Sequence, residues 1–166
     1  MRIALSFFII CIMFTSCAPS PENSRKGIAG TWRLVSMTCR DQKTGAENDL
    51  WGKDPIGFLT YTPEGRMSAV LASASRKITA ESAEKASPEE QLMLFRTSFA
   101  YAGTYTQKDT VILHHVEVAS DPTWIGKDQV RYFHLEGNKL TITGPPLQTV
   151  SDPHPQVLTL VWERVE

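Results

Sequence analysis

The stretch His114 to Phe133, HHVEVASDPTWIGKDQVRYF, gathers the side chains of this chain that are best suited to chemistry. It holds two of the chain's four histidines, together with an acid, an amide and an arginine, around one tryptophan. Side chains of these types bind metals, transfer protons or hold the polar group of a ligand. Which of these they do depends on the elements that position them.

The cluster predicts a hairpin whose polar residues share one face. If Ser120 to Asp128 joins two antiparallel strands, His115 and Glu117 come opposite Gln129 and Arg131. Residues two apart lie on the same face of a strand, so all four can share a face. That face points either into a protein interior, where Glu117 and Arg131 would pair, or to solvent as a polar ladder.

Alternation by itself argues partly against the interior placement. The residues that alternate with the polar ones along the two strands are more apolar, so strand alternation predicts that they are the buried set. They are Ile112, Val116, Val118, Val130 and Tyr132. An apolar outer wall is nevertheless expected wherever a helix covers the sheet. Both placements therefore stay open at this level.

Metal and nucleophile chemistry are poorly supported by these residues. Adjacent side chains on a strand point to opposite faces, so His114 and His115 cannot both chelate one ion without a bulge. His134 and His154 are distant in sequence, and no serine sits in a nucleophile turn. We therefore predict no metal site, no cofactor and no catalytic residue.

The elements around the cluster read as short antiparallel strands separated by turns. About eight or nine strands are expected, enough to close a small barrel in an all-β fold. The predicted strands are Thr31–Cys39, Gly57–Tyr61, Arg66–Leu71, Gly103–Thr106, Thr110–Ala119, Val130–Leu135, Lys139–Thr143 and Val157–Val165. No repeat interrupts the chain after Gly27, which indicates one domain.

One helix interrupts this pattern. Ser87-Pro88-Glu89-Glu90 combines a capping hydroxyl, a proline at the first helical position and a glutamate three residues after the serine. Leu92, Phe95 and Phe99 then recur at helical spacing. We expect one helix packed against the barrel, with a ligand-gating lid as the alternative.

The first sixteen residues, MRIALSFFIICIMFTS, have the layout of a secretory signal peptide: one cation followed by an apolar run too short to span a bilayer. Phe14-Thr15-Ser16-Cys17 resembles a bacterial lipobox, although phenylalanine replaces the usual leucine. Lipidation of Cys17 is therefore expected, with an ordinary signal peptide as the alternative. An acylated (palmitate-type) cysteine would anchor the chain in a membrane.

The domain boundaries follow from this leader. Residues 1–16 are a predicted signal peptide, 17–27 a polar tether and 28–166 the barrel domain. Ala18 stands where inner-membrane retention would call for Asp, which favours an outer-membrane lipoprotein facing the periplasm. Without Arg2 the chain has 17 − 1 = 16 basic and 18 acidic residues, so nothing in its charge favours binding to nucleic acid.

Two ends of the chain carry a family resemblance. Gly30-Thr31-Trp32 resembles the Gly-x-Trp opening strand of lipocalins, in which the tryptophan closes the barrel base and stacks on an arginine of the last strand. Arg164 is the matching arginine by order. Further stretches resemble the bacterial lipocalin-like domain family: YTPEGRMSA (61–69), YAGTY (101–105), HHVEV (114–118), WIG (124–126) and QVR (129–131). The resemblance covers roughly Ile28 to Val165.

This resemblance implies a barrel with an internal cavity open at one end, which binds a small apolar molecule. The stretches that carry the resemblance include the four polar residues of the hairpin together with Trp124 and Gly126. We therefore favour the interior placement of these polar residues, with His114 as a wall residue. Asp41–Asp54 and Gly144–Pro155 match no pattern and are expected to shape the cavity mouth.

Two functions of different class, and a third without a ligand, are compatible with these residues. The first is a binding module for a small hydrophobic or amphipathic ligand; its polar head would contact His115, Glu117, Gln129 and Arg131, and its body Tyr61, Met67 and Trp124. The second is an isomerase- or cyclase-type enzyme, in which Glu117 or His115 moves a proton beside Arg131. The third is a structural lipoprotein. Binding is the prediction, because no feature requires chemistry.

Overall fold

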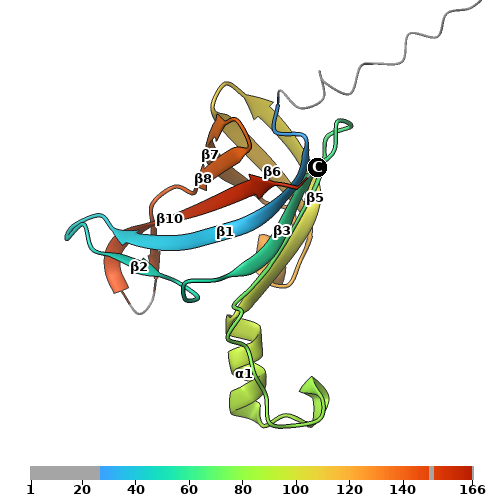
Figure 1. Cartoon of the computed structure of the whole chain (residues 1–166), viewed down its shortest axis with the longest axis vertical. Coiled ribbons are helices and arrows are strands. Elements are labelled where there is room, and N and C mark those ends of the chain that lie inside the picture. Colours follow the sequence, from blue (N-terminus) through green and yellow to red (C-terminus); the bar gives the residue numbers. More distant parts are fainter. Residues whose placement is uncertain (1–26, 150–151, 166) are drawn as a thin grey trace, which may run out of the picture.

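The protein is a closed antiparallel barrel, seen in a computed structural model that describes residues 27–149 and 152–165 (Figure 1). One sheet of ten strands closes on itself because β1 pairs with β10 as well as with β3. The wall strands are β1 (Gly30–Asp41), β3 (Ile56–Tyr61), β4 (Arg66–Ala72), β5 (Ser98–Lys108), β6 (Val111–Ala119), β7 (Asp128–Glu136), β8 (Lys139–Thr143) and β10 (Asp152–Arg164). The short strands β2 (Glu47–Asp49) and β9 (Leu147–Thr149) pair with β1 and β10 at their ends. The predicted all-β barrel is confirmed.

Every second side chain along the strands points inward, and these side chains fill the barrel interior. In β4, Met67, Ala69 and Leu71 are buried while the residues between them are exposed or half-buried. The same alternation on the other strands produces one apolar cluster inside the barrel, whose largest members are Trp32 and Trp162. Burial of this face, at about 25 cal/mol per Å² of apolar surface, is the main force that holds the sheet closed.

One end of the barrel is plugged by a tryptophan and an arginine, as the lipocalin resemblance implied. Trp32 is fully buried and its indole Nε1 donates to the carbonyl of Ile28 at 2.8 Å. Arg164 lies over the indole ring, and its guanidinium also donates to the carbonyls of Gly27 and Ala29, each at 2.6 Å. These contacts tie the first described residues to the last strand and close that end.

The opposite end carries the longer connections. These are the segments 42–55, 73–97, 120–127 and the stretch from 144 into β9, whereas tight turns such as 62–65 and 137–138 lie at the plugged end. The segment with α1 projects beyond the barrel in Figure 1. The barrel therefore has a closed end and an end shaped by four connections.

Helix α1 (Pro88–Arg96) begins as its sequence predicts. The Ser87 side chain accepts from the backbone N–H of Glu90, whose carboxylate accepts from that of Ser87, which is a complete capping box. The helix meets the barrel at its C-terminal end, and Leu92 and Phe95 remain 47% and 60% exposed. Within the described residues, no helix has the length and apolar character to cross a bilayer.

Candidate functional site

A cavity of about 580 Å³ lies inside the barrel and opens between the four longer connections. Its volume falls in the range of small-molecule sites. Most of its wall is aliphatic or aromatic, and polar side chains interrupt it at several places. The lining residues are Met37, Leu50, Trp51, Leu59, Ala69, Leu71, Phe95, Arg96, Ser98, Phe99, Tyr101, His114, Ser120, Asp121, Trp124, Gln129, Arg131, Ile142, Gly144, Pro145, Leu147, Leu158, Leu160 and Trp162.

The mouth is built by the loops that matched no sequence pattern. Leu50 and Trp51 come from the first connection, and Pro145 and Leu147 from the last. The expectation that these two loops shape the cavity mouth is confirmed for their described residues. Phe95, at the end of α1, completes the rim on another side.

Trp124 is carried into the cavity by a short 3-10 helix, η3 (Pro122–Trp124). Asp121 caps this turn by accepting from the backbone N–H of Thr123 at 2.9 Å, and Pro122 occupies its first position. The Trp124 ring then packs 4.6 Å from the Phe99 ring and 5.5 Å from that of Tyr101, measured between centroids. The loop thus supplies an aromatic wall for a flat or apolar ligand.

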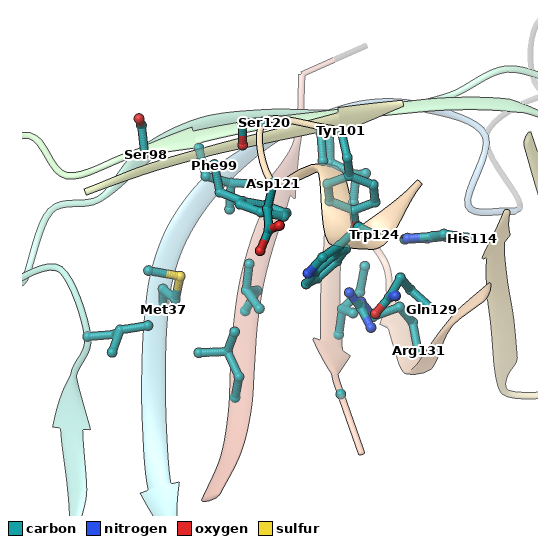
Figure 2. A pocket seen from close by; sticks show the side chains of 18 of the residues that line it. Met37, Ser98, Phe99, Tyr101, His114, Ser120, Asp121, Trp124, Gln129 and Arg131 are labelled. Carbon is teal, nitrogen blue, oxygen red and sulfur yellow. Dashed lines mark hydrogen bonds between the residues drawn. The ribbon is translucent and has the colours of Figure 1, made fainter. Parts of the chain in front are cut away.

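Arg131 places a positive charge beside this wall. Its guanidinium carbon lies 5.6 Å from the centroid of Trp124, and Nη1 donates to the Val130 carbonyl at 2.8 Å. Its positive charge also lowers the pKa of Tyr101, against the larger, opposite effect of burial. Figure 2 shows Tyr101, Trp124, Gln129 and Arg131 close together, apart from Met37 and Ser98.

His114 is clamped between two tyrosines. Its Nε2 lies 2.7 Å from the Tyr61 hydroxyl and its Nδ1 lies 2.9 Å from the Tyr101 hydroxyl. Burial, with lesser repulsion from Arg131 and then His115, lowers the pKa of His114 to about 3. Burial likewise raises the pKa of both tyrosines. At neutral pH the three groups therefore form an uncharged network.

His115 and Glu117, expected inside, lie on the outer face of the barrel. His115 Nδ1 is 2.6 Å from a carboxylate oxygen of Asp128, and its Nε2 is 3.2 Å from the Thr106 hydroxyl. Both oxygens of Glu117 accept from the guanidinium of Arg66, at 2.9 and 2.8 Å. The prediction that His115 and Glu117 share a face with Gln129 and Arg131 is wrong, and so is the pairing of Glu117 with Arg131.

The error has a specific cause in strand register. His115 pairs with Asp128, so that His114 pairs with Gln129 and Ile112 with Arg131. The ladder between β5 and β6 also shifts between Ala102 and Gly103, opposite the segment that contains Glu117. An odd difference in register exchanges the faces of a strand, so Gln129 and Arg131 lie on the face of His114 and not on that of His115 and Glu117.

The other predicted contacts divide into two groups. Trp124, Gln129 and Arg131 line the cavity, whereas Tyr61 and Met67 are buried in the core and are not among its lining residues. Ligand contact by each of these residues stays a prediction. Sequence reasoning missed His114 and Tyr101, although the apolar parity of Ile112 and Val116 marked His114 as inward-facing.

Within residues 27–149 and 152–165, no group of three His, Cys, Asp or Glu side chains is placed to hold a metal ion. The functional groups of the cavity include the Arg131 guanidinium, the rings of Phe99 and Trp124, and the neutral Tyr-His-Tyr network. This arrangement can orient an amphipathic molecule by its polar end.

Comparison with known proteins agrees with the fold and with the cavity. The model of a family described as a lipocalin-like domain matches residues 29–165. The 4'-hydroxy-3'-methoxypropiophenone carrier protein of Aspergillus oryzae (strain ATCC 42149 / RIB 40) is 31% identical over 84 residues, which cover 46% of this chain and 68% of the relative. With a family match along nearly the whole barrel, a Trp32–Arg164 plug and an open-ended cavity, the chain belongs to the lipocalin-like domain family.

Proposed function

We propose that the protein is a lipid-anchored binding protein of the cell envelope, which holds a small apolar or amphipathic molecule in the barrel cavity. The observation that carries the proposal is the cavity itself. Its wall is mainly apolar, it carries a few polar side chains such as Gln129 and Arg131, and it is open at one end. Sites of this composition orient a ligand by a few polar contacts while its body is desolvated.

The relative from Aspergillus supports binding rather than catalysis. It is named as a carrier of a propiophenone, a small aromatic ketone. An aromatic body of that kind matches the rings of Phe99, Tyr101 and Trp124 in this chain. The isomerase or cyclase alternative loses its proton-transfer pair, because His115 and Glu117 face away from the cavity.

The lipid anchor and the outer-membrane, periplasm-facing location rest on the leader alone. Cys17 and the residues up to Lys26 lie outside the described part of the chain. Gly27 is bound to Arg164 at the plugged end of the barrel. An anchor at Cys17 would therefore attach to the end opposite the mouth, which would leave the mouth free to exchange ligand with the aqueous compartment.

The binding proposal is tested with a neutral fluorescent probe, N-phenyl-1-naphthylamine, titrated into the purified soluble domain. We expect saturable binding that 4'-hydroxy-3'-methoxypropiophenone displaces. Ala69→Phe should weaken binding, because Ala69 is buried and lines the cavity. Val70→Phe is the matched control, because Val70 is the next residue and its side chain is 59% exposed. Equal affinities of the two variants, or no binding by the parent domain, would refute the proposal.

The anchor is tested separately in cells. Globomycin blocks the peptidase that processes lipoprotein precursors, so treatment should cause a larger precursor to accumulate. Cys17→Ser should release the protein from the membrane fraction. A Cys17→Ser protein that is processed and stays membrane-bound like the parent would contradict the anchor and leave the binding proposal standing.

A further inference from the structure

The polar region of the cavity presents hydrogen-bond donors, and this bias indicates what kind of head group the ligand carries. The region consists of Tyr101, Gln129, Arg131 and the buried network behind them (Figure 2). The inference rests on the proposed binding function and adds the chemistry of the ligand.

The charge of Arg131 has no counter-ion in the described structure. Among residues 27–149 and 152–165, none of the ion pairs includes Arg131. Asp121 is a carboxylate on the cavity wall, but one of its oxygens accepts from both the backbone and the hydroxyl of Thr123. Contacts with Val130 and the Trp124 ring use only part of the donor capacity of the guanidinium.

The Tyr61, His114 and Tyr101 network adds a second donor by a count of hydrogens. Each tyrosine carries one hydroxyl hydrogen and neutral His114 carries one N–H, so two hydrogen bonds leave one hydrogen over. If that hydrogen belonged to Tyr61, it would be a buried donor without an acceptor, because Tyr61 is only 1% exposed and does not line the cavity. Unsatisfied buried donors are disfavoured, so the spare hydrogen belongs to Tyr101.

The resulting arrangement is directional. Tyr61 donates to Nε2 of His114, and Nδ1–H of His114 donates to the Tyr101 oxygen. Arg131 lies beside Tyr101 on the cavity wall (Figure 2). The Tyr101 hydroxyl hydrogen then faces the cavity that Tyr101 lines. Tyr101 and Arg131 thus offer two donors side by side.

We propose that the ligand carries an oxyanion, a carboxylate or an acidic phenol oxygen, which binds between the Arg131 guanidinium and the Tyr101 hydroxyl while its apolar body packs along Trp124 and Phe99. An oxyanion supplies acceptors for both donors. It also supplies the negative charge that would neutralise the Arg131 guanidinium. A neutral ketone or alcohol would supply an acceptor alone.

A matched pair of probes tests this inference. The probe 8-anilinonaphthalene-1-sulfonate has the same ring skeleton as N-phenyl-1-naphthylamine and adds one anionic group. The parent domain should bind the anionic probe about tenfold more tightly, the size of effect expected for one charge-assisted hydrogen bond. Arg131→Gln should remove this preference and leave the neutral probe bound, and Tyr101→Phe should reduce it severalfold.

Controls separate cavity binding from surface binding and from loss of fold. Arg66→Gln removes a cation from the outer face and should keep the preference. Arg131→Lys retains the charge without the fork of donors and should keep part of it. Equal affinity of the parent domain for the two probes, or an unchanged preference in Arg131→Gln and Arg131→Lys, would overturn the proposal that the ligand carries an oxyanion. The proposed binding function would still stand. Failure of both probes to bind would overturn the proposed binding function as well.

Discussion

The guanidinium carbon of Arg164 lies 4.1 Å from the centroid of the Trp32 ring, at the plugged end of the barrel. The two residues are paired across strands β1 and β10, which join the beginning and the end of the described chain. One contact therefore both fills the base of the barrel and closes the sheet.

Trp32→Ala should destabilise the fold by about 3–5 kcal/mol, the usual cost of removing a fully buried large aromatic side chain. Thermal or urea unfolding of the domain measures it. Trp124→Ala is the control: Trp124 is only partly buried and belongs to the cavity wall, so its loss should affect probe binding more than stability. An unchanged melting temperature for Trp32→Ala would contradict the plug.

Burial of neutral His114 makes stability depend on pH in a defined window. Its pKa falls from 6.5 to about 3 on folding, so the unfolded chain takes up the proton first as the pH drops. The contribution of His114 is fully present above pH 6.5 and is lost between pH 6.5 and 3, at about 1.4 kcal/mol per pH unit. The groups that face it are Tyr61, Tyr101 and Arg131.

Unfolding free energies measured across this window test the effect. His114→Gln should flatten the slope, whereas His134→Gln should not, because His134 is exposed on β7. The same slope in both variants would show that other groups cause the acid sensitivity.

Gly103 should tolerate no side chain. A Cβ at this position would lie 2.0 Å from the carbonyl oxygen of His115 on the neighbouring strand, where the ladder shifts. Gly103→Ala should therefore cost about 1–3 kcal/mol or prevent folding. Gly144→Ala is the control, because a Cβ at Gly144 would meet no atom within 4 Å. Equal unfolding free energies of the two variants would contradict this packing.

Glu117→Gln should leave both stability and probe affinity nearly unchanged. Its ion pair with Arg66 is about half exposed on the outer face, where such pairs contribute little. Titration with N-phenyl-1-naphthylamine and a thermal melt measure the two effects. A marked loss of affinity would show that Glu117 reaches the ligand and would restore the interior placement of its side chain.

Phe95 should slow ligand exchange at the mouth. It lines the cavity from the end of α1 and is 60% exposed, so Phe95→Ser should speed probe dissociation severalfold with little loss of stability. Leu92→Ser lies on the same helix away from the cavity lining and should not change the rate. Stopped-flow dissociation distinguishes the two, and equal rates would mean that α1 has no gating role.

Much of the fold could be predicted from local signals. The capping box at Ser87, the alternation of β4 and the Gly-x-Trp opening each involve residues close together in the chain. The pairing of Trp32 with Arg164 was implied by family resemblance, not by local pattern, and the structure confirms it. The loops Asp41–Asp54 and Gly144–Pro155 were expected to shape the mouth because they matched no pattern, and residues of both line the cavity.

The face of the polar cluster required tertiary structure. The hairpin, its loop and the types of residue that it carries could be read from the chain alone, because they depend on local turn and strand chemistry. Alternation with Ile112 and Val116 already marked His114 as inward-facing. Whether Gln129 and Arg131 share that face depends on the pairing of β6 with β7, because a change of one residue in register exchanges the faces. The closed barrel, with β6 held between β5 and β7, is what places His114 toward the ligand site and His115 toward solvent.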